Sequence, residues 1–274
     1  MFLNSVSGSV LRTCNKTCIS AAALLNIIAA LKVYEGLSIA PVEAFVQRRK
    51  RSRQYKTPDS LPSSMQKQIT SILQVLTLAE KLKFELRHSF TSSGRQESVA
   101  EHSWRMSLMA VLIEPLLQQR VDMERLLKMI IVHDLVEAEA GDVSALDLMR
   151  DPSLKALKIE REQQAIENLR RTLSQTNGQE ICNLFYEFEQ KETYESKIAN
   201  ALDKLEVQLQ HNHADLSTWE EIEYDMSFMM GKHVQFDEAL NELKRQIESD
   251  AEQKMQYAGI DTVVIKQRIQ SLRK

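Results

Sequence analysis

Residues 129–142 read MIIVHDLVEAEAGD, an apolar sequence of helical character that is interrupted by the adjacent polar residues His133 and Asp134. Burying an imidazole and a carboxylate without partners is unfavourable. A divalent metal ion is the simplest partner, because imidazole nitrogen and carboxylate oxygen both suit first-row transition metals. Two further residues, His102 and Asp203, are candidate ligands elsewhere in the chain. The pattern therefore predicts a metal site built on helices.

The composition of the 274-residue chain favours helices. Hydrophobic residues make up 43% of it, enough for a sizeable core, and only 7 Gly and 5 Pro interrupt the chain. Long stretches without either residue are rich in the strong helix formers Leu, Ala, Glu, Lys and Gln. We therefore expect an all-α protein. The net charge of −3 gives no indication of nucleic-acid binding, and we expect none.

The first 60 residues differ from the remainder in charge, because they contain nine basic and three acidic residues in a chain whose net charge is −3. The apolar run over residues 21–31 is too short to span a bilayer, so no membrane span is expected. It follows basic residues, as in a targeting segment, but lacks a clear small-residue cleavage site. We favour a basic extension, either an accessory helix or a loosely ordered segment, over a targeting segment.

The domain organisation follows from a Pro- and Ser-rich boundary at residues 57–64. We expect an N-terminal extension over residues 1–60, a main domain over residues 66–240 and a C-terminal helical segment over residues 241–274. The basic run at residues 48–53 reads as a solvated linker, with a polyanion-binding patch or localisation signal as the alternative.

The three cysteines, Cys14, Cys18 and Cys182, show no metal-ligand clustering. Ordinary thiols fit a reducing environment, so we expect a cytoplasmic protein.

Two of the expected helices carry His102 and Asp203. Residues 98–101, Ser-Val-Ala-Glu, form a capping box, so a helix should begin at Ser98 and place His102 in its first or second turn. A later helix is expected over residues 196–212, where Asp203 lies beside the apolar stripe. An unpaired carboxylate is unfavourable there, which again indicates a bound cation.

A third helix is expected over residues 123–140, with Gly141 as its stop signal. Asp134 and Glu137 are three residues apart, and His133 and Glu137 are four apart. All three side chains can therefore address one side of this helix.

The four remaining histidines belong to no comparable arrangement; they are His88, His211, His213 and His233. His211-Asn212-His213 lies near an expected helix end, and we expect it at the surface.

The chain resembles the HD-domain superfamily of metal-dependent phosphohydrolases, and within it the 5′-deoxynucleotidase-like branch. The resemblance extends from about residue 73 to residue 240 and rests on blocks that occur in the family's order. These are RQESVAEHSWR at residues 95–105, HDLVEAEAGDV at 133–143, and YEFE at 186–189 with ALDKLE at 201–206. The resemblance implies an all-α bundle of five or more helices around a single metal.

The same resemblance implies roles for individual residues. The metal ligands would be His102, His133, Asp134 and Asp203. Glu137 matches the family's catalytic acid/base, and Asp142 matches a carboxylate that assists it. Arg87 falls where the branch uses an arginine to bind the nucleotide phosphate. The family usually carries a Trp in that segment, whereas residues 87–90 read RHSF, so the substrate-binding aromatic residue is Phe90 or is missing.

A ligand set of two His and two Asp leaves positions on a five- or six-coordinate metal for water and a phosphate oxygen. One divalent transition metal is expected: Mn²⁺, Co²⁺ and Fe²⁺ suit these ligands best, and Zn²⁺ is a further candidate. HD proteins with two-metal sites generally carry extra His ligands between the second and last motifs. No His occurs between His133 and Asp203, which favours a single metal.

The expected function is hydrolysis of (deoxy)nucleoside 5′-monophosphates to nucleoside and phosphate by a metal-dependent phosphomonoesterase. One alternative is an HD hydrolase of a nucleoside triphosphate or guanosine tetraphosphate, which predicts basic residues flanking the pocket. The other is a non-catalytic nucleotide-binding regulator. The expected partner is a small-molecule nucleotide, and the exposed helices are compatible with a homodimer.

Overall fold

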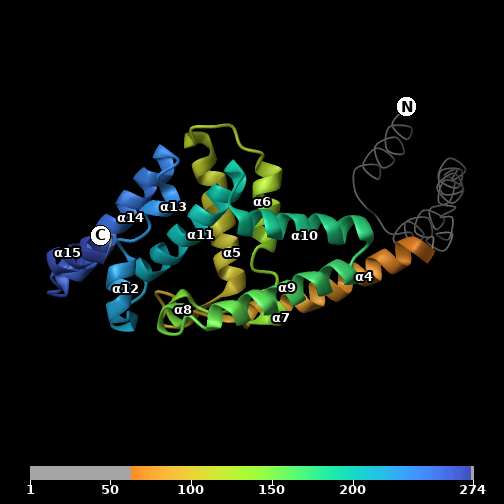
Figure 1. Cartoon of the computed structure of the whole chain (residues 1–274), viewed down its shortest axis with the longest axis horizontal. Helices are drawn as coiled ribbons and strands as arrows, with labels where there is room; N and C mark the ends of the chain where they lie inside the picture. Colours follow the sequence, from red (N-terminus) through yellow and green to blue (C-terminus); the bar gives the residue numbers. More distant parts are fainter. Residues whose placement is uncertain (1–62, 273–274) are drawn as a thin grey trace, which may run out of the picture. The chain divides into compact units, whose positions relative to one another are not determined.

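Helices account for most of residues 63–272, the part of the chain that the computed structural model describes (Figure 1). The expected all-α class is confirmed, with one short hairpin added. The extension expected over residues 1–60 lies outside the described residues. Between residues 63 and 272, no helix combines the length and apolar character that a bilayer crossing requires.

The long helices in chain order are α4 Ser63–Ala79, α5 Val99–Ile113, α6 Met123–Val132, α9 Leu154–Thr172, α10 Gln175–Gln190, α11 Tyr194–His213, α14 Glu238–Tyr257 and α15 Thr262–Leu272. The shorter helices and helical turns are η1 Glu80–Lys83, η2 Glu114–Leu116, α7 Glu137–Ala140, α8 Ala145–Arg150, η3 Leu216–Thr218, α12 Glu221–Met226 and α13 Gly231–Val234. The strands within the described range are β1 Leu86–Phe90 and β2 Gln96–Ser98.

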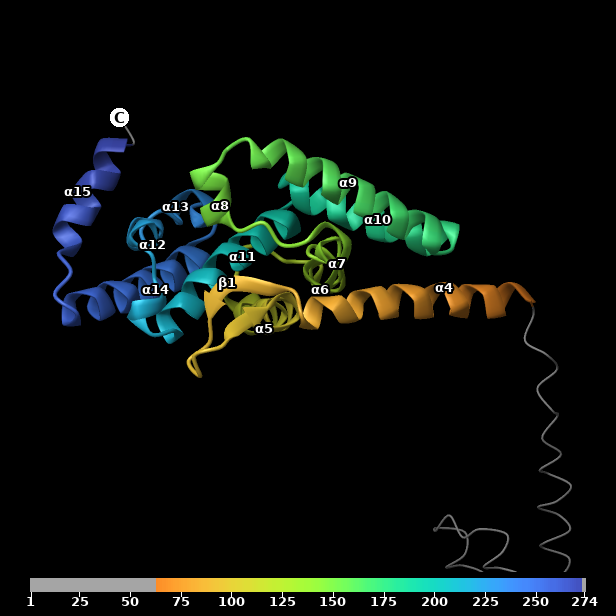
Figure 2. The same cartoon turned by 90° about the horizontal axis from the view of Figure 1, so that it is seen from below.

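Helix α11 is enclosed by other helices. It packs against α5, α6, α10, α13 and α14 (Figures 1 and 2). Its apolar residues Ile198, Leu202 and Leu205 are fully buried in the main hydrophobic cluster, together with residues of α5 and α6. Because several sides of α11 are covered, its polar residues Asp203 and Glu206 are also buried. These two carboxylates need polar partners inside the bundle.

Helices α9 and α10 form a hairpin and pack against each other, side by side in the view of Figure 2. A Cβ atom at Gly178 of α10 would overlap the backbone carbonyl of Arg170 on α9, so the close approach of these helices requires glycine there. The second hydrophobic cluster lies between this hairpin, α5 and the segment around α7; its buried members include Val99, Leu135, Val136, Ala138, Ala165, Ile166, Leu169 and Phe185.

The prediction of a continuous helix over residues 123–140 is wrong. Helix α6 ends at Val132, and turns lead to α7, which begins at Glu137. The backbone N–H groups of Leu135 and Glu137 bond to carbonyls only three residues earlier, at 3.1 and 3.0 Å. Val132 belongs to the main cluster, whereas Leu135 and Val136 belong to the second. The break redirects the chain so that both apolar groups are buried.

The hairpin of β1 and β2 was not predicted. Leu86 pairs with Ser98 and Phe90 pairs with Gln96 in antiparallel register, with an irregularity between the two pairs. Gly94 adopts a φ of +85° in the connecting turn, a conformation that glycine tolerates best. The strands are short and irregular, and they therefore lack the alternating pattern that identifies a half-buried strand.

The capping box predicted at Ser98 is confirmed, and it fixes the start of α5 directly after β2. Ser98 Oγ accepts a hydrogen bond from Glu101 N at 3.3 Å, and Ser98 N donates to the Glu101 carboxylate at 3.0 Å. We predict that Ser98→Ala lowers the free energy of unfolding by about 1 kcal/mol, the usual value of such a cap.

Urea denaturation of the Ser98→Ala protein measures this effect. Ser92→Ala in the exposed turn is the matched control and should change stability by less than about 0.5 kcal/mol. Equal stabilities of the two variants would contradict the proposed contribution of the cap.

Candidate metal centre

The four residues predicted as metal ligands come from three neighbouring parts of the bundle. His102 lies at the start of α5, His133 and Asp134 directly follow α6, and Asp203 lies in the middle of α11. Helices α5, α6 and α11 pack against one another. Segments that are distant in sequence therefore supply one group of side chains.

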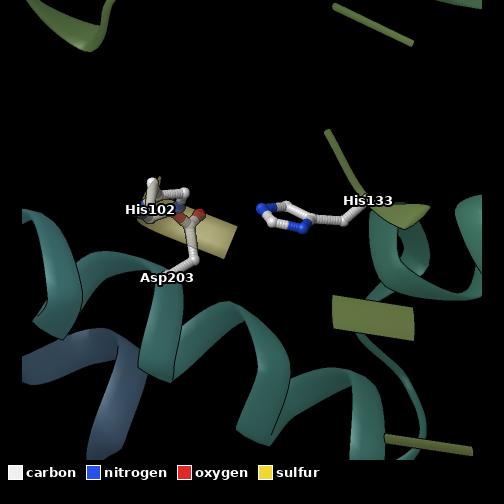
Figure 3. A group of neighbouring side chains, drawn as sticks. All are labelled: His102, His133 and Asp203. Carbon is white, nitrogen blue, oxygen red and sulfur yellow. The ribbon is translucent and has the colours of Figure 1, made fainter. Parts of the chain in front are cut away.

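Three of these residues form a compact cluster, shown in Figure 3. The potential ligand atoms of His102, His133 and Asp203 lie within 4.8 Å of one another, and the His133 ring points toward the other two side chains. His102 Nε2 lies 3.3 Å from Asp203 Oδ1. Asp134 adjoins this cluster, with its Oδ2 atom 3.0 Å from His133 Nε2 and 3.8 Å from His102 Nε2.

Both imidazoles are held through their Nδ1 atoms. His133 Nδ1 donates a hydrogen bond to the Ile130 carbonyl at 2.7 Å, and His102 Nδ1 donates to the Glu206 carboxylate. Both Nε2 atoms are buried, and no hydrogen bond of normal geometry satisfies either within the described part of the chain. Metal-binding histidines commonly have this arrangement, with one nitrogen anchored and the other free. These residues therefore fit a metal site.

The charges around the cluster also favour a cation. Burial and the Arg87 charge lower the pKa of His102, but Glu206 and Asp203 outweigh them and raise it to about 10. Burial opposes ionisation of Asp203, but the charges of Lys204 and His102 hold its pKa well below the usual value. The cluster thus stabilises positive charge at its centre, as either a proton or a metal ion.

A buried carboxylate that the sequence reasoning missed supports His102. Glu206 lies three residues after Asp203 on α11 and is fully buried. It accepts hydrogen bonds from His102 Nδ1 and from Arg105 Nε, the latter at 2.6 Å. Glu206 occurs in the same sequence block as Asp203, and this helical spacing was the available signal.

Glu97 lies between Arg105, which binds Glu206, and Arg87. Its carboxylate lies 3.7 Å from Arg105 Nη2 and 3.9 Å from Arg87 Nε. Burial and the Glu206 charge raise the pKa of Glu97 to about 7. Arg87 Nη1 lies 3.5 Å from Asp134 Oδ2. Arg87 is therefore held at the edge of the candidate metal cluster.

The two carboxylates predicted to assist proton transfer lie close by. Glu137 is buried at the start of α7, and its Oε2 atom has no hydrogen-bond partner among residues 63–272. Burial, together with the charges of Asp134 and Asp142, raises the pKa of Glu137 to about 10. Burial also raises the pKa of Asp142. Lys158 of α9 approaches Glu137 Oε1 to 3.9 Å.

A cavity of about 520 Å³ adjoins the cluster, a volume within the usual range for small-molecule sites. The predicted site residues that line it are Arg87, His133, Asp134, Glu137, Asp142 and Asp203. Phe90 is not among the lining residues, and its carbonyl instead accepts a hydrogen bond from Gln210. From the same strand, His88 and Ser89 line the cavity.

Known proteins are similar to this chain in sequence. The 5′-deoxynucleotidase HDDC2 of Danio rerio is 34% identical over 149 residues, which cover 53% of this chain and 71% of that protein. The protein of the same name from Homo sapiens is 30% identical over 156 residues, which cover 56% of this chain and 71% of that protein.

A solved structure agrees with the fold. The crystal structure of a "predicted metal-dependent phosphohydrolase" from Magnetospirillum magnetotacticum has a TM-score of 0.58 and 24% sequence identity, covering 71% of this chain and 98% of that one. The family model of the HD domain matches residues 79–244, more than half of the chain and all residues of the candidate centre. The chain therefore belongs to the HD domain family.

Proposed function

We propose that this chain is a metal-dependent phosphomonoesterase that hydrolyses (deoxy)nucleoside 5′-monophosphates to nucleoside and phosphate. The observation that carries the proposal is the pair of buried, unsatisfied Nε2 atoms of His102 and His133, which lie beside Asp203 and Asp134. The two aspartates, His133 and Arg87 line one cavity. The name 5′-deoxynucleotidase, borne by relatives at 30% and 34% identity, supports this substrate class.

One divalent cation would be held by His102, His133, Asp134 and Asp203. Mn²⁺, Co²⁺ and Fe²⁺ suit these nitrogen and oxygen ligands best, and Zn²⁺ is also compatible with them. When bound, the cation supplies Lewis-acid chemistry, because it lowers the pKa of water and neutralises phosphate charge.

Arg87 would bind the phosphate. Its planar guanidinium group can donate two hydrogen bonds to two phosphate oxygens at once. Burial disfavours its charge, but the surrounding carboxylates, Asp134 foremost, keep its pKa above the ordinary value. Glu97 and Asp134 lie on different sides of the guanidinium, at Nε and Nη1 respectively, and restrict its orientation.

Glu137 would supply a proton to the departing 5′-oxygen. In the metal-free protein, burial and the neighbouring carboxylates raise the pKa of Glu137, which favours the protonated form that a proton donor requires. The unsatisfied Oε2 atom is the position at which this proton would be held. The Asp142 charge contributes to the raised pKa of Glu137, and Asp142 would thereby assist the transfer.

The charge of the cavity favours a monophosphate over the alternative substrates. Apart from Glu137, six acidic residues and six lysines or arginines line the cavity, so these side chains supply no excess of the positive charge that a triphosphate or tetraphosphate requires. A bound cation and Arg87 supply the charge that a single phosphate group needs. Glu137, buried at the cavity with its Oε2 atom unsatisfied among residues 63–272, also argues for catalysis and against a purely regulatory role.

The direct test is phosphate release from ribo- and deoxyribonucleoside 5′-monophosphates. The full-length protein would be stripped of metal and reloaded separately with Mn²⁺, Co²⁺, Fe²⁺ or Zn²⁺. We expect metal-dependent release of orthophosphate that is lost in Asp134→Ala. Asp250→Ala, which removes an exposed carboxylate on α14, should retain activity.

Two outcomes would contradict this proposal. Release of pyrophosphate or triphosphate from more highly phosphorylated nucleotides would favour the second hydrolase class. Tight nucleotide binding without release of phosphate in any metal would favour the regulator.

Glu137→Gln should retain the metal but lower kcat by about 100-fold or more, because the amide cannot transfer the proton. Steady-state kinetics with metal analysis of the same sample measures both properties. Glu139→Gln changes an exposed carboxylate of the same short helix and should leave kcat unchanged. A Glu137→Gln enzyme with full metal content and near-normal kcat would exclude Glu137 as the proton donor.

A further inference from the structure

A second ionic cluster lines the same cavity, and the proposed phosphate chemistry does not use it. Glu223 Oε1 lies 3.3 Å from His88 Nε2 and 3.1 Å from His211 Nε2. Ser89 Oγ lies 3.3 Å from the same nitrogen of His211. These four residues line the cavity together with three of the candidate metal ligands, His133, Asp134 and Asp203.

Two members of this cluster are committed to contacts within the protein. Glu223 is 3% exposed, and its Oε2 atom accepts a hydrogen bond from Glu220 N at 2.7 Å in the capping box of α12. His211 is buried beside Trp219, whose Nε1 donates to the His211 carbonyl at 3.0 Å. Neither Glu223 nor the His211 ring can readily turn toward a ligand.

His88 is the member of the cluster that can reach a ligand. Its side chain is 29% exposed, and its Nε2 atom faces Glu223. Among residues 63–272, this buried Nε2 atom makes no hydrogen bond of normal geometry, and no hydrogen bond involves the Nδ1 atom of His88. The Glu223 carboxylate raises the pKa of His88, which favours a protonated ring with Nδ1 as a donor.

The position of His88 relative to Arg87 indicates which part of the substrate it meets. The two residues are consecutive on β1, so their Cα atoms are about 3.8 Å apart. Both line the cavity, although alternate residues of a regular strand face opposite sides. The irregular register of β1 between Leu86 and Phe90 accounts for this departure.

We propose that His88 binds the nucleoside part of the substrate by donating a hydrogen bond from Nδ1 to an acceptor on the sugar or base, while Glu223 and His211 position its ring. The inference rests on the proposed function, because a phosphate bound at Arg87 places the attached nucleoside next to His88. Three methionines that also line the cavity, Met226, Met229 and Met230, supply a flexible apolar surface for the base.

Equilibrium binding tests this role without requiring turnover. The ligands are deoxyadenosine 5′-monophosphate, 2-deoxyribose 5-phosphate and inorganic phosphate, and the protein is the metal-loaded full chain carrying Glu137→Gln. Adding His88→Leu should weaken nucleotide binding about 10-fold or more, the effect of losing a hydrogen bond from a charged donor, with phosphate affinity changed less than about twofold. His88→Gln, which keeps a donor, should restore part of the affinity.

Two variants serve as comparisons. Arg87→Ala should weaken the binding of both the nucleotide and inorganic phosphate, because it removes the phosphate contact that the two ligands share. His213→Leu alters an exposed histidine of α11 outside the cavity and should change neither affinity. If His88→Leu weakens the binding of both 2-deoxyribose 5-phosphate and the nucleotide, the hydrogen-bond acceptor is on the sugar. If it weakens the binding of the nucleotide alone, the acceptor is on the base.

The inference is overturned if His88→Leu leaves the nucleotide affinity unchanged. It is also overturned if the substitution lowers the affinity for inorganic phosphate as strongly as the affinity for the nucleotide. Failure of the proposed function is a separate result, namely the absence of phosphate release by the unsubstituted enzyme.

Discussion

The hydrogen bond from His102 Nδ1 to Glu206 is the contact on which the candidate centre depends. Both residues are fully buried where α5 packs against α11. A buried carboxylate is tolerated only with good partners, and Arg105 supplies a second one. The bond joins the two helices and leaves His102 Nε2 beside Asp203. Fold stability and ligand placement therefore rest on the same side chains.

The non-helical segments after α6 and before α5 place the other residues of the site. The break after α6 lets His133 anchor its Nδ1 on the Ile130 carbonyl and face α5 and α11. The hairpin before α5 brings Arg87 and His88 to the cavity wall as neighbours. Arg87 borders the candidate metal cluster, whereas His88 borders the Glu223 cluster. In the proposed function, the part of the cavity at Arg87 would bind the phosphate and the part at His88 would bind the nucleoside.

Local sequence patterns predicted much of this arrangement. Helical periodicity and the capping box at Ser98 located α5 and α11. The His-Asp pair, with His102 and Asp203, pointed to the residues that lie together in the candidate metal cluster. The short, irregular hairpin and the break after α6 were missed, because both arise from burial against distant segments. Periodicity within one helix carries no information about such contacts.

The ionic cluster around Glu223 could not be predicted from local sequence patterns either, because it also depends on contacts between distant segments. His211 was expected at the surface, but it is buried, because the segment with Trp219 folds back over the end of α11. His88 and His211 are separated by 123 positions in the chain, yet both contact the Glu223 carboxylate and their ring centroids lie 6.5 Å apart. No motif within the sequence links these three residues.

The amount of metal bound per chain tests the central claim most directly. The stripped full-length protein would be reloaded with Mn²⁺, freed of excess metal and analysed by elemental mass spectrometry, beside the Asp203→Ala variant. We predict one equivalent of metal per chain in the unsubstituted protein and almost none in the variant. Equal metal content in both proteins, or two equivalents in the unsubstituted protein, would contradict a single cation held by this cluster.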